Sequence, residues 1–233
     1  IIPAISGALA LRDREKTLRL TESACRLTGL LAFPCAVGLA AIPGPILEVL
    51  FWGQEEACAL AAPLLRLLAP SVFFAAMVSV SNPVLQAMGR VQRPVVSMAL
   101  GALVKAGCNY ALVGIPEVGI HGAPIATGLC YGVILLLNLL SIRRLGVRFS
   151  LRRSFLRPLL SAGVMGLAVW AGYAPIRGLF GAGRLMSLCA LLAVIALAAG
   201  LYLAMLVWTR ALPREDILML PKGEKIVKWL KIQ

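Results

Sequence analysis

The sequence predicts an all-α protein, a polytopic transmembrane helix bundle with six complete spans preceded by the end of another. The composition is 60% hydrophobic and 14% charged, with a mean hydropathy of +0.90, whereas soluble domains carry about 25% charged residues. Apolar runs of about 20 residues, the length that crosses a hydrocarbon core of about 30 Å, recur along the chain. Basic residues gather between these runs. Together these features indicate an integral membrane protein.

The apolar runs also give the domain organisation. Residues 1-11 resemble the last turns of a truncated transmembrane helix, and we expect residues 12-26 to form a cytoplasmic loop. The transmembrane domain covers residues 27-208, with spans at 27-51, 67-88, 94-113, 120-142, 154-176 and 185-208. The first span contains Pro34, Pro43 and Pro45, which predict a kinked helix whose freed carbonyls find other partners.

The basic residues predict the orientation of the spans. The net charge is +13, but its distribution between apolar runs favours membrane topology over nucleic-acid binding. The alternate turns hold only Arg177 and Arg184. The other loops and the tail hold Arg12, Arg14, Lys16, Arg19, Arg26, Arg90, Arg93, Arg143, Arg144, Arg148, Arg152, Arg153, Arg157, Arg210, Arg214, Lys222, Lys225, Lys228 and Lys231. By the positive-inside rule, both ends of the six-span block face the cytoplasm of a multi-pass cell-membrane protein.

Lys105 is the one charged residue of the third span. It lies roughly 16 Å along the helix from Pro94, near the centre of the bilayer. An ammonium group there costs about 3 kcal/mol, so Lys105 should face other helices or a wet cavity, with Asn109 one turn further on the same face. The two residues are candidates for substrate binding, and the alternative is a lysine paired with a polar neighbour for structural reasons.

Other polar residues at the ends of spans are also candidates for function. Asn82 and Gln86 either line a cavity or cap a kink near the inner end of the second span. Arg66 is expected at the headgroup level, with Glu48 as its partner in an interfacial pair.

The tail at residues 209-233 is predicted to be a basic amphipathic helix on the cytoplasmic membrane surface. Its apolar residues recur at helical spacing opposite a row of lysines, a pattern typical of surface-bound helices. A partner-binding role is the alternative. The residues expected at the membrane surface are Lys225, Lys228, Trp229 and Lys231.

The sequence does not support enzyme chemistry, and no cofactor or metal is predicted. His121 is the one histidine, and it lies in an expected outward turn between glycines, so neither a histidine-based triad nor a zinc cluster is predicted. There is no phosphate-binding GxxxxGK[ST] run. The cysteines lack CxxC spacing and are interpreted as small buried hydrophobes. Small residues let membrane helices approach closely, and this use is expected for glycines such as Gly101, Gly128, Gly132, Gly163 and Gly166.

Four stretches carry a family resemblance that covers nearly the whole chain. They are Ile2-Pro-Ala-Ile-Ser6, Leu31-Ala-Phe-Pro-Cys-Ala-Val-Gly38 after Arg26-Leu-Thr, Gly89-Arg-Val-Gln-Arg-Pro94, and Gly119-Ile-His-Gly-Ala-Pro-Ile-Ala-Thr127. In this order and spacing they resemble the polysaccharide-biosynthesis/stage V sporulation protein B (SpoVB, MurJ-related) branch of the multidrug/oligosaccharidyl-lipid/polysaccharide exporter superfamily.

The resemblance implies the C-terminal half, and so the C-terminal lobe, of a MATE-like flippase with fourteen helices. Such a protein moves undecaprenyl-pyrophosphate-linked oligosaccharide or peptidoglycan precursors across the cell membrane by alternating access. The missing N-terminal lobe would be required, and Lys105 would attract the pyrophosphate as a point charge. Two alternatives stay open, a cation-coupled multidrug exporter of the same superfamily and a non-transporting scaffold for cell-wall synthesis.

Overall fold

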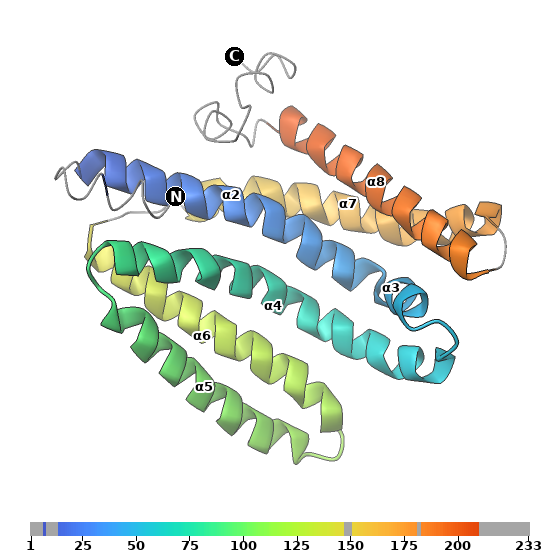
Figure 1. Cartoon of the computed structure of the whole chain (residues 1–233), viewed down its shortest axis with the longest axis horizontal. Helices are drawn as coiled ribbons and strands as arrows, with labels where there is room; N and C mark the ends of the chain where they lie inside the picture. The colour runs from blue at the N-terminus through green and yellow to red at the C-terminus, as the bar shows by residue number, and fades with distance from the viewer. Residues whose placement is uncertain (1–6, 8–13, 147–150, 181–182, 210–233) are drawn as a thin grey trace.

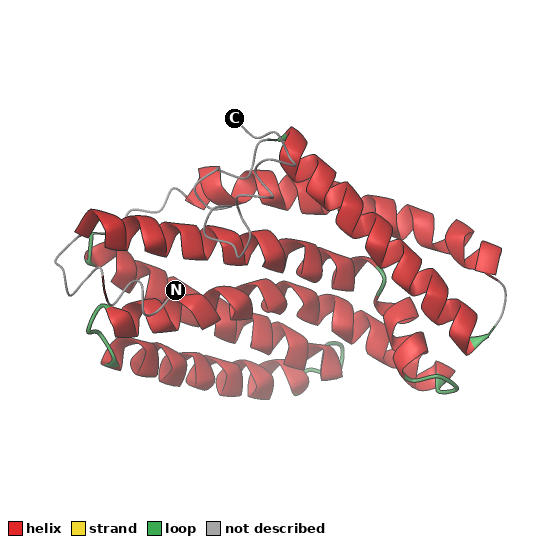
Figure 2. Ribbon diagram, turned by 45° about the horizontal axis from the view of Figure 1, so that its top comes forward, coloured by secondary structure: helices red, strands yellow, loops and turns green. Residues whose placement is uncertain are grey.

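The structure is a computed structural model that describes residues 7, 14–146, 151–180 and 183–209. Within these residues all regular elements are helical, as Figure 2 shows. They are α2 (Arg14–Ala41), α3 (Pro43–Leu50), α4 (Glu55–Ala87), α5 (Gln92–Val113), the 3-10 turn η1 (Gly119–His121), α6 (Gly122–Arg144), α7 (Leu151–Phe180) and α8 (Arg184–Trp208). Six helices in the described part are long and apolar enough to cross a membrane. The predicted fold class is therefore confirmed.

The long helices pack in an order that differs from their order in the chain. Helix α5 packs on α6, α6 on α4, α4 on α2, α2 on α7 and α7 on α8, while short α3 contacts α4 and α8. Figure 1 shows α2 between α7 and α4, with α5 at one edge of the bundle. Helices α4, α5 and α6 therefore form one packed group, which joins the rest chiefly through α2.

A group of aromatic rings joins the two larger apolar clusters of the bundle. Phe33 of α2 stacks on Phe73 of α4 with ring centroids 4.3 Å apart, and the ring of Phe155 meets both rings edge-on. Phe73 and Phe155 pack against the cluster of α2, α3, α7 and α8 and also against the cluster of α2, α4 and α6. Offset and edge-on aromatic contacts stabilise such a joint beyond the apolar area they bury.

Pro34 lies inside α2 without breaking it. Proline has no N–H, so the carbonyl of Leu30 loses the donor that the helix would supply. The hydroxyl of Tyr202 on α8 donates to this carbonyl at 2.7 Å. The predicted use of a neighbouring helix to satisfy a freed carbonyl is thus observed here, and it fixes α8 against α2.

The first predicted span, residues 27-51, is interrupted after Ala41. Ile42 has the non-helical angles φ −129° and ψ 53°, and α3 starts at Pro43. Neither Pro43 nor Pro45 can donate a backbone hydrogen bond, so the helix cannot continue its regular ladder through this point. The expected kink is therefore a full break between two helices.

The expected loop at residues 12-26 needs correction, because α2 begins at Arg14. Ion pairs spaced by one turn, Arg19 with Glu15 and Arg26 with Glu22, support helix in this charged run. Its cytoplasmic location stays a prediction. Residues 1–6, 8–13 and 210–233, which include the expected helix end and nearly all of the surface tail, lie outside the described residues.

The second predicted span, residues 67-88, is part of a longer helix. Helix α4 begins at Glu55, so it extends for 33 residues or about 50 Å, well beyond a hydrocarbon core of about 30 Å. The other expected spans match their helices within a few residues at each end. Arg66 consequently lies within α4 and not at its start.

Two of the glycines expected at close contacts lie there. A Cβ atom at Gly101 would meet the side chain of Ile134 at 2.4 Å, and one at Gly166 would meet Val37 at 2.3 Å. Apart from the nearby backbone of their own helices, no atom lies within 4 Å of a Cβ placed at Gly128, Gly132 or Gly163, so for these three the expectation was wrong within the described part of the chain.

Candidate functional site

A buried polar cluster joins α4, α5 and α6 near the α4–α5 turn. At its centre is Asn138, which is fully buried. Its Nδ2 group donates to Ser81 Oγ at 2.9 Å and to Asn82 Oδ1 at 2.7 Å, while its Oδ1 accepts from Ser97 Oγ at 2.7 Å. Asn82 Nδ2 also lies 3.5 Å from the sulfur of Met98. We call Ser81, Asn82, Ser97 and Asn138 the asparagine cluster.

The α4–α5 turn brings Ser97, the member of this cluster on α5, back alongside α4. Gly89 adopts φ +73°, and the N–H groups of Gly89 and Arg90 donate to the carbonyls of Gln86 and Leu85. These two bonds are those of a Schellman motif, which satisfies the last carbonyls of a helix and turns the chain sharply. The chain therefore returns at once, and Ser97 of α5 lies beside the last turns of α4.

The asparagine cluster has little capacity left for a ligand. An asparagine side chain has two N–H donors, and both are used in Asn138. Its neighbours Ser81 and Ser97 are also buried. The arrangement suits a structural link between three helices. Of the two residues on α4 that were expected to line a cavity, Asn82 therefore has a structural partner, Asn138. Gln86 is exposed one turn further on.

Sequence reasoning missed Asn138 and Ser97, although a signal was present. Ser81, Asn82, Ser97 and Asn138 are polar residues in apolar runs, each within a few turns of the basic end of its helix. Residues at similar depth in neighbouring spans are candidates to pair, because unpaired polar groups are costly in a membrane.

Lys105 and Asn109 lie on α5, away from the asparagine cluster. Lys105 is exposed, and it lies one turn beyond Gly101, where α5 packs closely on Ile134 of α6. Asn109 is partly buried, and its Oδ1 atom is covered but has no hydrogen-bond partner among the described residues. The two polar groups share one side of an edge helix, and the described chain gives Lys105 no ion pair.

A second polar region lies at the break between α2 and α3. In a continuous helix, the carbonyls of Leu39, Ala40 and Ala41 would accept hydrogen bonds from the backbone nitrogens of residues 43, 44 and 45, but residues 43 and 45 are prolines and have no N–H. Arg66 of α4 supplies one replacement, because its Nε–H donates to Ala40 O at 3.1 Å. A cation beside the carbonyl end of a helix is also favoured by the helix dipole.

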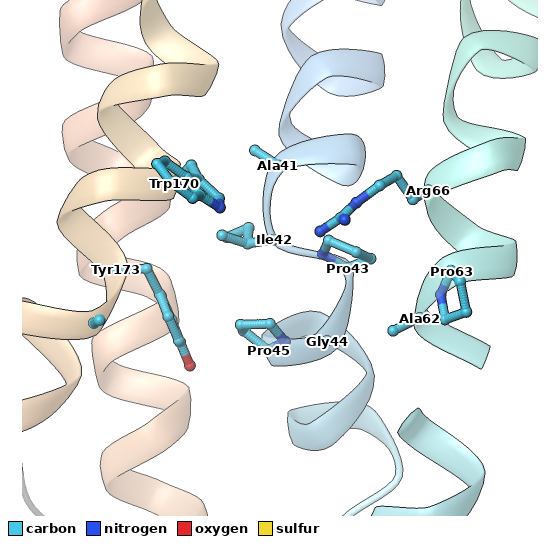
Figure 3. Close-up of a pocket in the computed structure, with 11 residues that line it drawn as sticks. Ala41, Ile42, Pro43, Gly44, Pro45, Ala62, Pro63, Arg66, Trp170 and Tyr173 are labelled. Carbon is cyan, nitrogen blue, oxygen red and sulfur yellow. The ribbon is translucent and has the colours of Figure 1, made fainter. Parts of the chain in front are cut away.

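A half-open pocket of about 380 Å³ surrounds this break. In Figure 3, Arg66 and Ala62 approach it from α4, Trp170 and Tyr173 lie on the α7 side, and the broken segment passes between them. We call this the helix-break pocket. It is lined by Ala41, Ile42, Pro43, Gly44, Pro45, Ala62, Pro63, Arg66, Trp170, Tyr173 and Ala174.

The structure gives Arg66 a different hydrogen-bond partner from the one expected. Its bond goes to Ala40 O, and Glu48, which lies on α3, does not line the pocket. The interfacial pair of Glu48 with Arg66 stays a prediction. Trp170 and Tyr173 were not foreseen, since their position beside the break depends on the packing of α7 against α2.

The described residues hold no group of three or more histidine, cysteine, aspartate or glutamate side chains that could bind a metal. All six cysteines are free. Cys25, Cys58 and Cys130 are buried as expected, whereas Cys35 and Cys189 are exposed. The four residues predicted for the membrane surface, Lys225, Lys228, Trp229 and Lys231, lie outside the described residues.

With this geometry in place, comparison with known proteins identifies the family. The family model described as Lipid II flippase MurJ matches residues 1–191. The chain belongs to the lipid II flippase MurJ family. The expected exporter superfamily is confirmed at this level. The sporulation-protein branch and the placement in the C-terminal half stay predictions.

Two relatives of the MurJ-family chain come from Bacillus subtilis (strain 168). Uncharacterized membrane protein YabM is 26% identical over 233 residues, which cover 99% of this chain and 42% of YabM. Lipid II flippase MurJ is 27% identical over 172 residues, which cover 72% of this chain and 31% of that protein. The chain therefore spans less than half the length of these relatives.

A solved structure has the same fold. The lipid II flippase MurJ in an inward closed conformation aligns with a TM-score of 0.69 at 16% identity, over 90% of this chain and 42% of that one. At this identity the match shows the fold alone. The helical arrangement of the MurJ-family chain is thus found within a larger protein.

Proposed function

We propose that the chain forms one lobe of a flippase that moves a lipid-linked oligosaccharide or peptidoglycan precursor across the cell membrane. The observation that carries this proposal is the MurJ family match over residues 1–191. The shared fold supports it. A flippase moves its substrate without making or breaking its bonds, so the proposal assigns no catalytic residues.

Alternating access needs two bodies that rock against each other. The chain covers 42% of YabM and of the solved MurJ chain, which leaves room for a second lobe. From the family resemblance we propose that this chain supplies the C-terminal lobe and that an N-terminal lobe completes the transporter. In this proposal both ends of the six-span block face the cytoplasm, in keeping with the charged loops. The substrate is of the undecaprenyl-pyrophosphate type.

The geometry of α5 supports a substrate role for Lys105. Its exposed ammonium lies roughly 16 Å along the helix from Pro94, far from either end of a span. A charge at this depth costs about 3 kcal/mol in lipid, so it needs water or protein beside it. An edge helix that carries exposed Lys105, with partly buried Asn109 one turn further on, fits a wall facing a polar cavity. A pyrophosphate there would meet a point charge and a nearby amide.

The test replaces Lys105 with alanine in the full-length protein, reconstituted in vesicles with a fluorescent lipid-linked precursor. We expect the initial translocation rate to fall about tenfold, because the loss of one charge-assisted contact weakens substrate binding by about 1.4 kcal/mol. Lys105→Arg should retain most of the rate. Translocation is measured as the loss of protection of the labelled headgroup from a membrane-impermeant quencher.

Leu103→Ala is the matched control, because Leu103 is an exposed residue on the same helix with no polar group. It should transport at the parental rate. An unchanged rate in Lys105→Ala would remove Lys105 from the mechanism while leaving the flippase proposal in place. Vesicles in which the parental protein does not accelerate translocation over protein-free vesicles would contradict the proposed function itself.

A further inference from the structure

The helix-break pocket has the composition of an anion site. Arg66 is the one charged residue among those that line it, and no carboxylate lines it. The other lining residues are alanine, glycine, isoleucine, proline and two aromatic residues. A pocket of about 380 Å³ with apolar walls and one oriented polar group is large enough to hold a small ligand group. The chemistry points to a ligand with an anionic head and apolar parts.

Arg66 is held so that most of its donors stay available. A guanidinium group has five N–H donors in a planar fork, and one of them is used by the Ala40 carbonyl. The described residues give no hydrogen-bond partner to the two terminal amino groups. The carbonyl end of α2 thus positions the fork, while two parallel N–H groups can still bind two oxygens of a phosphate.

The opposite wall offers surfaces that suit the carbon skeleton of a headgroup. Trp170 is 66% exposed and supplies most of this surface, whereas Tyr173, one turn further along α7, lines the pocket but is largely buried. Figure 3 shows both rings across the broken segment from Arg66. Tryptophan and tyrosine are enriched where the bilayer meets water, since each combines an apolar ring with a polar atom.

The position of Arg66 along α4 places the pocket at a particular depth. From Arg66 to Ala87, the last residue of α4, the helix extends for about 31 Å. This length equals the hydrocarbon core, and Ala87 adjoins the basic turn that carries Arg90 and Arg93. If that turn lies at one membrane surface, Arg66 lies at the headgroups of the opposite leaflet.

We propose that the helix-break pocket binds the phosphate of an anionic phospholipid from this opposite leaflet. Arg66 holds the phosphate, and the glycerol and the first acyl carbons lie against Trp170 and Tyr173. The site is separate from Lys105, which lies on α5 at the edge of the bundle and does not line the pocket. The proposal of a phospholipid site is therefore independent of whether Lys105 takes part in transport.

The experiment measures lipid binding to the full-length protein by native mass spectrometry in detergent titrated with phosphatidylglycerol. We expect Arg66→Gln to weaken the tightest binding event about tenfold, as the loss of a bidentate charged contact predicts. Arg66→Lys should bind the lipid with an affinity between those of the parent and Arg66→Gln, because lysine keeps the charge but lacks the planar fork of N–H donors. Arg90→Gln is the matched control, since Arg90 is exposed in the α4–α5 turn.

A second variant tests the pocket without touching the cation. Ala62→Phe places a ring in the pocket one turn before Arg66 and leaves the bond from Arg66 to Ala40 in place. We expect it to weaken phosphatidylglycerol binding about as much as Arg66→Gln, because a filled cavity excludes the headgroup. Ala59→Phe is its control, because Ala59 is exposed on the same helix outside the pocket.

Three results would overturn the proposal. Diacylglycerol of the same acyl chains binding as tightly as phosphatidylglycerol would mean that the phosphate is not recognised. Inorganic phosphate displacing the lipid at equal concentration would mean that the site takes free phosphate. Parental binding in Ala62→Phe would place the lipid outside the pocket, even if Arg66→Gln weakened it. Should Arg66→Gln fail to fold, the Ala62→Phe result alone decides.

Discussion

The asparagine cluster and the helix-break pocket are both polar regions of an apolar bundle, and they differ in how fully their groups are used. In the cluster, both N–H donors of buried Asn138 and its acceptor oxygen bond to residues of two other helices. In the pocket, Arg66 donates one hydrogen bond to a carbonyl of α2, and its other N–H groups lie beside a cavity.

This difference distinguishes polar residues that hold helices together from polar residues that can bind a ligand. Polar groups in a membrane need partners, and those that bond fully to each other fix the positions of their helices. A charged group that is anchored yet incompletely bonded keeps capacity for a ligand. The comparison predicts that changes in the cluster act mainly on stability, whereas changes in the pocket act mainly on lipid binding.

The largest effect on stability is expected from Asn138→Leu. This change removes three hydrogen bonds between helices, each contributing about 0.6 kcal/mol in a membrane protein, so the free energy of unfolding should fall by about 2 kcal/mol. Equilibrium unfolding of the full-length protein in mixed micelles measures it. Ser141→Ala is the control, because Ser141 bonds within its own helix to Leu137 O. A cost below that of Ser141→Ala would mean that the cluster is not a structural link.

A smaller stability effect is expected from Arg66→Gln in the same unfolding assay. The variant loses one bond from a charged donor to the carbonyl end of α2, so we expect a cost of about 1 kcal/mol. Arg90→Gln should stay within about 0.5 kcal/mol of the parent, as exposed changes usually do. A cost for Arg66→Gln above that of Asn138→Leu would make Arg66 chiefly a structural cap, and the contrast between the two regions would fail.

The overall bundle could be predicted from the sequence because the bilayer imposes one length and one polarity on each span. The lack of an N–H in proline predicts a kink near Pro43, but it does not predict that the helix breaks completely there. The charged run from Arg14 to Arg26 predicts a loop before a span that begins at residue 27. In the structure this run is helical, because pairs such as Arg19 with Glu15 stabilise a helix. Charge alone is a poor guide to where a helix ends.

The partners of the polar residues could not be predicted, because they come from distant parts of the chain. Asn138 bonds to Ser81, and Arg66 bonds to Ala40, across 57 and 26 residues. Periodicity shows that Lys105 and Asn109 share a face, but it does not show which helix, if any, covers that face. Tertiary packing decides these contacts. Of the four polar residues expected in a cavity, Asn82 belongs to the asparagine cluster. The other three, Gln86, Lys105 and Asn109, lie outside it.

The smallest effect is expected from Gln86→Ala, which sharpens this separation. Gln86 is exposed one turn beyond Asn82, outside the asparagine cluster. The change should alter the free energy of unfolding by less than about 0.5 kcal/mol, whereas Asn82→Ala, which loses a bond to Asn138, should cost about 0.6 kcal/mol or more. The same two variants are then compared in the translocation assay. If Gln86→Ala slows translocation at unchanged stability, Gln86 belongs with Lys105 on a wall of the transport cavity. If it destabilises the protein as much as Asn82→Ala, the asparagine cluster extends one turn further along α4 than its hydrogen bonds indicate.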